Sequence, residues 1–395
     1  MTDTDPFRAE VRAWLEANCP ASMRKPLVAD DIVWSGSQLG FKTEDQRLWF
    51  ERTRDRGWFA PGWPREYGGG GLTAKQARVV EEEMRRLHCR PPQFNLGVWM
   101  LGPVLLEFGS EAQKKEHLIP MMQGRVRWCQ GFSEPNAGSD LASLKTAAVR
   151  DGDDFVVNGS KIWTSYGDKA DWMYGLVRTD PKAPKKQEGI SFVLIDMKSP
   201  GVSVKPIELI SGKSAFCQVF FDNVRVPARQ LVGPLNSGWT VAKRLMQHER
   251  AAMSKFSEGA APSTDLLEVA RPLLRDATGQ VRDPELRTRL ARELMDEQAF
   301  SLTSRRLAEQ MLAHEDVRGL ASIMKVVQTE QEQRKYSLLV DLMGSRGLSW
   351  AGDGFTTDEH DACHNWLLSK TYTLGGGTSE IQLNIIAKRT LGLPG

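Results

Sequence analysis

The apolar residues of this chain change their spacing twice along its 395 residues, and this change limits the folds that the chain can adopt. Up to about residue 125, and again from about residue 236, they recur at helical spacing. Between these zones they form short runs rich in β-branched and aromatic residues, separated by turn residues. Because no helix-length pattern lies between those runs, we expect the middle zone to be an all-β module rather than a βαβ unit.

This order predicts an α+β, mainly helical chain of several domains. We place a helical domain at 1–125, a small β-domain at 126–235 and a helical bundle at 236–395. Two or three domains are usual for a chain of this length. A small β-domain between two helical ones favours a ligand cleft at a domain junction.

Local signals predict where several elements begin. Capping boxes indicate helix starts at Thr43-x-x-Gln46, Thr73-x-x-Gln76, Ser110-x-x-Gln113 and Ser379-x-x-Gln382. Asn158-Gly159 predicts a hairpin turn. Strands are expected at 172–179, 189–197, 202–210 and 216–226. Long helices are expected around Leu286–Met311 and Ala321–Met343, and we interpret the charged run 81–86 as a solvated helix face.

Charge and cysteine usage exclude several classes of protein. A net charge of +2 gives no global electrostatic case for binding nucleic acid or a membrane surface. There is no apolar run of 18 residues and no secretory signal at the N-terminus, so we expect neither a membrane span nor export. The 5 cysteines include no C-x-x-C motif, which favours reduced thiols and a cytoplasmic location.

Common catalytic motifs are absent from the sequence. It has no G-x-G-x-x-G after a strand, no P-loop and no G-x-S-x-G, which disfavours Rossmann-type nucleotide binding and serine hydrolysis. His360-x-x-x-His364 has the spacing of two metal ligands on one helical face. No convincing third ligand accompanies it, so we predict a hydrogen-bonded histidine pair and no metal site.

Three segments suggest a ligand when taken together. Gly375-Gly-Gly-Thr-Ser-Glu380 leads a glycine run into a helix, where free amides favour an anion, although such glycines can serve the turn alone. Trp128–Asp140 contains a polar loop that could be only a domain-boundary turn. In Lys161–Gly167, an aromatic ring beside small hydroxyls suits a planar ligand with polar edges; the alternative is a core tryptophan.

In kind, order and spacing these segments resemble the acyl-CoA dehydrogenase family. The family strings appear here as Ser133–Asp140, Lys161–Ser165 and Gly377–Gln382. Val219–Pro227 and Ile385–Pro394 extend the resemblance over nearly the whole chain. It implies a helical domain, a β-domain and a C-terminal four-helix bundle, with FAD bound between subunits. The implied activity removes two hydrogens across the α,β bond of an acyl-CoA thioester to give the 2-enoyl-CoA.

The resemblance also assigns residues to the cofactor. Those expected to line the flavin ring are Gln130, Phe132, Ser133, Trp163 and Ser165. Ser139 would contact the CoA arm or the flavin phosphates. Thr378 and Glu380 would reach FAD from the last helix.

The catalytic base is expected in an unusual place. Many family members carry a glutamate directly before the Gly-Thr-Ser string, where this chain has Gly376. A second family arrangement places the base on the first helix of the C-terminal domain, which matches Glu249. We therefore expect Glu249 to take the α-proton while the β-hydride goes to flavin N5, although a surface carboxylate is the plain alternative. The amide of Gly376 would donate to the thioester carbonyl, and Arg250 would orient the site.

The resemblance further implies partners and leaves two other functions open. A homo-oligomer, tetramer or dimer, is expected, with an electron-transfer flavoprotein as electron acceptor. The combination of motifs is similar to bacterial members that act on dicarboxylyl, steroid side-chain or cyclic acyl-CoAs, some of which are hetero-oligomers. The alternatives are a catalytically silent partner subunit of such an assembly, and a flavin oxidase or monooxygenase on the same fold.

Overall fold

The structure is a computed structural model that describes residues 6–25, 27, 31–212, 214–257, 266–275, 278–280, 283–313 and 317–394. The side chains at 250–257, 308, 311, 312 and 318 are outside the described residues. The chain forms two compact units, which are described separately. The first contains residues 1–207 and 215–262, and the second contains 208–214 and 263–395.

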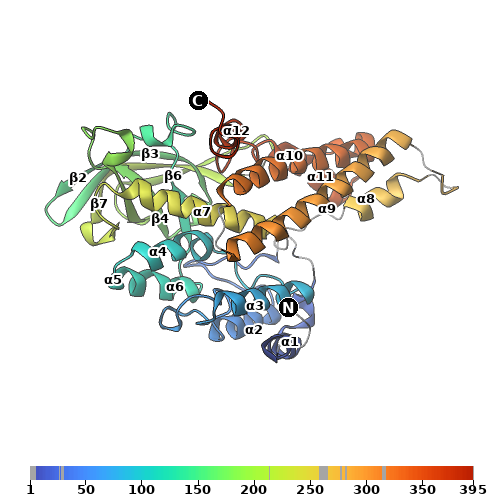
Figure 1. Cartoon of the computed structure of the whole chain (residues 1–395), viewed down its shortest axis with the longest axis horizontal. Coiled ribbons are helices and arrows are strands. Elements are labelled where there is room, and N and C mark those ends of the chain that lie inside the picture. Colours follow the sequence, from blue (N-terminus) through green and yellow to red (C-terminus); the bar gives the residue numbers. More distant parts are fainter. Residues whose placement is uncertain are drawn as a thin grey trace. The chain divides into compact units, whose positions relative to one another are not determined.

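The first unit begins with short helices (Figure 1). They are α1 (Pro6–Asn18), α2 (Glu44–Asp55), α3 (Ala74–Arg86), α4 (Gly102–Phe108), α5 (Glu111–Gln113) and α6 (Ile119–Met122). The capping boxes at Thr73 and Ser110 are confirmed in full. Thr43 also caps its helix, but the Gln46 side chain accepts from Lys42 N instead of from Thr43 N. Side-chain acceptors for the first amides thus set where these helices start.

The charged run on α3 corrects one prediction. Glu83 does not lie on a solvated face, because it is only 1% exposed. Its carboxylate accepts from Arg8 at 2.8 Å and from Arg12 at 3.0 Å, both on α1, and from Arg86 at 2.6 Å. The reason is tertiary: α1 packs on α3 and brings two guanidinium groups that compensate the buried charge.

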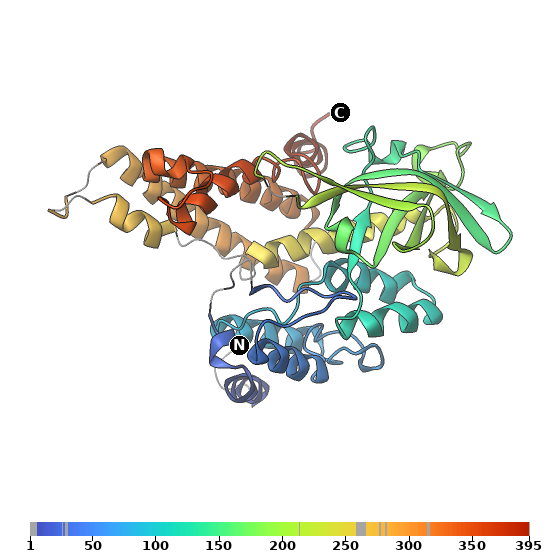
Figure 2. The same cartoon turned by 180° about the vertical axis from the view of Figure 1, so that it is seen from behind.

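The middle of the chain folds into the predicted all-β module, drawn in green in Figure 2. The strands are β1 (Trp128–Gly131), β2 (Ala147–Asp151), β3 (Asp154–Ser165), β4 (Trp172–Arg178), β5 (Ile190–Asp196), β6 (Val202–Ile207), β7 (Phe216–Pro227) and β8 (Leu231–Val232). They form one sheet in the order β6-β7-β3-β2-β4-β5-β8, and β1 pairs with β4 in parallel. The four strands predicted after residue 171 are confirmed.

The hairpin predicted at Asn158-Gly159 is wrong. β3 runs straight through these residues, and the two-residue turn lies earlier, at 152–153. Asn158-Gly159 instead marks a bulge against β7, where the ladder shifts between Val157 and Gly159. Gly159 has φ +144°, and a Cβ there would lie 2.7 Å from Thr146 Cα. The glycine therefore serves close strand packing, and the Asn158 side chain donates to Asn223 across the ladder.

The two faces of the sheet bury different cores. Along β4, Tyr174 and Leu176 point to the face that packs on helices, while Met173 and Val177 point to the face packed on other strands. Helix α7 (Gly238–Ser257) crosses the first face and contributes Leu245 to its core. Figure 1 shows α7 in yellow over the strands. The helix is thereby fixed against β4 and β5.

The second unit is helical, as predicted. Its helices are α8 (Leu266–Leu273), α9 (Pro284–Leu312), α10 (Arg318–Met343), α11 (Thr357–Ser369) and α12 (Ser379–Ile385). The last cap differs from the prediction: Thr378, and not Ser379, accepts from Ile381 N, at 3.3 Å. Gln382 does not complete a box, because its amide donates to Gly376 O at 3.2 Å. The N-cap of α12 is therefore one residue earlier than predicted, and the Gln382 side chain is hydrogen-bonded to the glycine loop that precedes the helix.

The two histidines on α11 are hydrogen-bonded to neighbouring loop residues. His360 contacts Ser349 Oγ at 3.1 Å and Gly352 O at 3.2 Å. His364 contacts Ser211 O at 2.7 Å and Trp350 O at 3.2 Å. No cluster of metal-ligating side chains was found in the described parts of the chain. No helix in those parts combines the length and apolarity needed to cross a membrane.

Candidate active site

A buried ion pair joins the first two motif segments. Lys161 Nζ lies 2.7 Å from Glu134 Oε1 and donates to Phe132 O at 3.2 Å. Lys161 is 1% exposed and Glu134 9%. The glutamate also accepts from Lys145 N at 2.6 Å and Thr146 N at 2.9 Å. These hydrogen bonds compensate both buried charges and fix the first loop to β3.

The environment of this pair shifts both pKa values. Burial lowers the pKa of Lys161 to about 8, although the charge of Glu134 acts in the opposite direction. Burial alone would raise the pKa of Glu134, but the Lys161 charge and the hydrogen bonds outweigh it and lower that pKa. The carboxylate is therefore ionised at neutral pH and acts as the anchor of the loop.

The first loop is a tight turn. Glu134 N donates to Ala137 O at 3.1 Å, and Ala137 N donates to Glu134 O at 3.0 Å. Ile162 N donates to Ser133 O at 2.9 Å, so half-buried Ser133 lies directly beside the second motif. Ser139 is exposed at the far side of the turn. The structure thus brings the first and second segments together.

Trp163 is not a core tryptophan. Its ring is 54% exposed, and its backbone has φ +61°, a left-handed conformation that costs a bulky residue free energy. In a regular strand Lys161 and Trp163 would share a face. A second bulge, between Lys161 and Thr164, breaks the ladder and turns the ring outward, edge-on to Phe216 at 6.2 Å between centroids. Half-buried Ser165 then pairs with Phe216.

Strand β1 carries two further expected residues. Gln130 is half-buried, and its Oε1 accepts from the Tyr174 hydroxyl at 3.2 Å. Phe132 is 5% exposed, and its ring packs edge-on against Tyr174 at 6.2 Å in the core. Its ring therefore belongs to the core, and only its backbone borders the loop. This face of the sheet supplies an amide and a phenol beside an apolar wall.

Glu249 lies on α7 and is half-buried. The pKa of the fully buried Tyr174 is raised well above its ordinary value, first by burial and then by the negative charge of Glu249. The charge of Glu249 thus acts on the phenol that contacts Gln130. Arg250 belongs to the same helix, but its side chain is outside the described residues.

The remaining expected residues belong to the second unit. Gly376 has φ +65° and Gly377 φ +91°, and within the described chain no backbone carbonyl accepts from the Gly376 N–H. Thr378 caps α12 with its hydroxyl. Glu380 is exposed, and hydrogen bonds from its own backbone N–H and from Thr378 lower its pKa. This unit offers the Gly376 amide, the Thr378 hydroxyl and the Glu380 carboxylate at the start of α12.

Two functional relationships escaped the sequence reasoning. Glu134 and Lys161 stood in the sequence only as parts of two motifs, and because Glu134 lies in a polar loop, no local pattern indicates that the two charges form a buried pair. Tyr174 was hidden in an apolar strand. Alternation within β4 puts Trp172 and Tyr174 on one face, but only the pairing of β1 with β4 brings the Tyr174 hydroxyl to Gln130.

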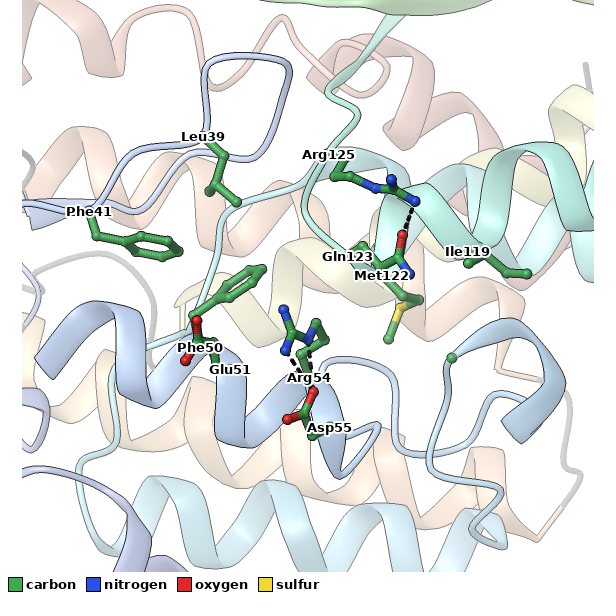
Figure 3. Close-up of a pocket in the computed structure, with 11 residues that line it drawn as sticks. Leu39, Phe41, Phe50, Glu51, Arg54, Asp55, Ile119, Met122, Gln123 and Arg125 are labelled. Carbon is green, nitrogen blue, oxygen red and sulfur yellow. Dashed lines mark hydrogen bonds and ion pairs between the residues drawn. The ribbon is translucent and has the colours of Figure 1, made fainter. Parts of the chain in front are cut away.

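A surface hollow of about 530 Å³ lies elsewhere in the first unit. Figure 3 shows Phe41 and Phe50 beside the Arg54–Asp55 ion pair, with Arg125 hydrogen-bonded to Gln123. The hollow is formed by α2, α6 and the loops next to them. None of the residues expected to bind cofactor or substrate lines it.

The residues around the two motif loops suit a planar ring with polar edges. The first two motif segments supply an exposed indole at Trp163, half-buried hydroxyl groups at Ser133 and Ser165, and the half-buried amide of Gln130 on the preceding strand. Exposed aromatic rings held in a left-handed backbone conformation are costly and are concentrated at functional sites. This donor set fits a flavin ring.

Known proteins match the chain along its length. Models of the acyl-CoA dehydrogenase N-terminal, middle and C-terminal domains match residues 2–125, 129–224 and 236–391. Acyl-CoA dehydrogenase IpdE1 of Mycobacterium tuberculosis is 34% identical over 100% of this chain and 99% of its own. Acyl-CoA dehydrogenase FadE34 of the same species is 36% identical over 86% of this chain, which spans only 45% of that protein.

Solved structures show the same fold. The steroid acyl-CoA dehydrogenase Tcur3481-Tcur3483 has a TM-score of 0.77 and 29% identity, with 100% of both chains covered. The ChsE4-ChsE5 complex from Mycobacterium tuberculosis has a TM-score of 0.75 and 29% identity, again over 100% of both chains. Three domain models, full-length relatives and matching folds agree, and the chain belongs to the acyl-CoA dehydrogenase family.

Proposed function

We propose that this acyl-CoA dehydrogenase binds FAD and converts an acyl-CoA thioester to the 2-enoyl-CoA, with Glu249 as the base. The observation that carries the proposal is that Glu249 is half-buried on α7, a helix that packs against β4 and β5, and that its charge contributes to raising the pKa of the buried Tyr174. Half-burial on a helix that packs against the sheet distinguishes Glu249 from the fully exposed carboxylates of the surface.

The chemistry explains why a carboxylate is needed there. The α-proton of a thioester is weakly acidic, so its removal requires a positioned base and a donor to the developing enolate oxygen. Gly376 has no side chain for proton transfer, which leaves the role to a carboxylate from another element. Its N–H is the proposed donor to the thioester carbonyl, and Arg250 is proposed to orient the site.

The proposed cofactor contacts follow the family resemblance and are supported by the exposure of these residues. Trp163 would cover the flavin ring, and Gln130, Ser133, Ser165 and the backbone at Phe132 would meet its edge. Ser139, Thr378 and Glu380 are proposed to contact phosphate or ribose groups of FAD or CoA. When bound, the flavin supplies the acceptor for the β-hydride, and the protein supplies orientation and electrostatics.

The named relatives suggest a substrate and a second candidate role. One structural neighbour is a steroid acyl-CoA dehydrogenase, which favours a ring-bearing acyl group over a simple fatty acyl chain. Two neighbours are assemblies of differently named chains. This supports a second candidate, in which the chain is a catalytically silent partner subunit in a hetero-oligomer. A homo-oligomer that passes electrons to an electron-transfer flavoprotein remains the first proposal.

The test is an anaerobic titration of the purified, FAD-loaded chain with straight-chain, branched, dicarboxylyl and steroid-derived acyl-CoAs. Bleaching of the visible flavin absorbance by one class of acyl-CoA supports the proposal and identifies the substrate class. A yellow protein that no thioester bleaches, even at equilibrium, supports the partner-subunit role. Fast reaction of the substrate-bleached enzyme with oxygen would indicate an oxidase instead.

A further inference from the structure

Gln130 and Tyr174 lie directly opposite each other in the parallel β1–β4 pair. Their side chains point to the same face, which is the one covered by α7. The Tyr174 oxygen lies 3.2 Å from Gln130 Oε1 and 3.1 Å from Met100 Sδ. A fully buried phenol therefore contacts the amide of a residue that, under the proposed function, borders the flavin.

The phenol ring is held rigidly. It stacks on Phe192, with centroids 6.1 Å apart and planes 5° from parallel, and meets Phe132 edge-on at 6.2 Å. All three rings belong to one buried core. Buried rings packed in this way have few rotamers available, so the Tyr174 hydroxyl keeps one position next to β1.

The hydroxyl has a single proton to donate. Burial and the charge of Glu249 keep Tyr174 in its neutral form. Of its two contacts, the thioether of Met100 is a weak acceptor and the amide oxygen of Gln130 a strong one. The proton therefore goes to Gln130 Oε1, and the amide is held with its oxygen toward Tyr174 and its NH₂ group turned away.

We propose that Tyr174 is a positioning residue, which fixes Gln130 so that the amide presents N–H donors and not its oxygen to the flavin ring. The inference rests on the proposed function for the identity of the ligand. Gln130 is half-buried and its oxygen is already engaged by the fully buried Tyr174, which leaves the NH₂ group as the end of the amide that is available to a ligand. Donors toward a ring that gains negative charge on reduction stabilise its reduced form.

The measurement is the reduction potential of the bound flavin, obtained by equilibration with a reference dye and without any acyl-CoA. Tyr174→Phe keeps the ring and removes the proton that orients the amide. We expect about tenfold weaker preference for the reduced form, which is a fall of ~30 mV for a two-electron couple. The FAD dissociation constant and visible spectrum of the variant are recorded in the same samples.

A double-mutant cycle separates positioning from a general structural effect. Gln130→Met removes the amide, so adding Tyr174→Phe to it should leave the potential unchanged. Tyr67→Phe is the matched control, because Tyr67 is also buried, at 4% exposed, and its hydroxyl donates to Glu111 at 2.6 Å. This control should bind FAD with an unchanged potential.

Each outcome decides the inference. A fall in potential with Gln130 present and none with Met at that position supports it. An equal fall in both backgrounds, or no fall in either, overturns it. If FAD binds and the cycle behaves as expected but no acyl-CoA bleaches the flavin, the proposed activity fails and the inference stands. If FAD does not bind to the unmodified chain, both fail.

Discussion

Lys161 Nζ lies 2.7 Å from Glu134 Oε1, and this buried ion pair spans 27 residues between two motif segments. Replacing one partner leaves the other charged and without compensation in a site that excludes water. We expect Glu134→Gln or Lys161→Met to lower the free energy of unfolding by about 3–5 kcal/mol. Urea denaturation followed by tryptophan fluorescence measures the change.

The double replacement provides the control for this first prediction. With both charges removed, no uncompensated ion remains, and the double variant should be more stable than either single one. If the two single losses simply add in the double variant, the pair is not an interacting unit and the anchor role is contradicted.

Glu249→Gln tests the base. The variant keeps the size of the side chain but cannot accept a proton, so flavin reduction by acyl-CoA should slow by about 10²–10⁴-fold while FAD stays bound. Anaerobic stopped-flow absorbance measures the rate. Glu107→Gln, a half-exposed carboxylate that pairs with Arg244 of α7, is the matched control and should retain the rate. An unimpaired Glu249→Gln variant would remove Glu249 from the mechanism.

Trp163→Gly should weaken the binding of FAD without lowering the stability of the folded chain. The ring is exposed and its backbone is left-handed, so glycine should leave the free energy of unfolding unchanged or raise it by up to about 1 kcal/mol. FAD affinity should fall about tenfold, because the aromatic contact is lost. Trp128→Ala, at a buried ring, should instead cost about 3–5 kcal/mol of stability. A strongly destabilised Trp163→Gly protein would contradict the strain argument.

Lowering the pH should reduce the free energy of unfolding of the first unit, because it protonates the buried carboxylate of Glu83. Burial raises its pKa, but the hydrogen bonds from Arg12, Arg86 and Arg8 prevail and lower the pKa from 4.5 to about 2. A lowered pKa means that the folded state favours the ionised form, so this stabilisation is complete above pH 4.5 and is lost as pH falls toward 2. The contribution is about 3 kcal/mol.

Chemical denaturation at several pH values tests this acid sensitivity. Glu83→Gln should lower stability at pH 7 and flatten the loss between pH 4.5 and 2. Glu188→Gln, at an exposed carboxylate paired with Lys185, should leave the pH profile unchanged. An identical acid profile for wild type and Glu83→Gln would show that other groups govern the transition.

Patterns that depend on burial alone could be predicted from the sequence. The strands from Trp172 onward and the long helices α9 and α10 follow directly from apolar periodicity. Elements whose local sequence signal conflicts with tertiary packing could not be predicted. Asn158-Gly159 favours a hairpin locally, but pairing with β7 extends β3 through it. Glu83 belongs to a charged run, and only the approach of α1 shows why it is buried.

The candidate site was predicted as a set of residues but not as a set of contacts. The motif resemblance named Trp163 and Gln130, yet neither the left-handed backbone of Trp163 nor the phenol above Gln130 has a local sequence signature. Both depend on which strands become neighbours. The role of each residue toward cofactor and substrate stays a prediction.

The bulge between Lys161 and Thr164 has a consequence for how the exposed indole could be lost. Deleting Trp163 would remove the extra residue and restore a regular ladder with β7, in which the buried Lys161 and Thr164 share one face. The sheet would keep its pairing and its core but would no longer carry the exposed ring. A single-codon deletion could thus remove this surface feature without unfolding the β-domain.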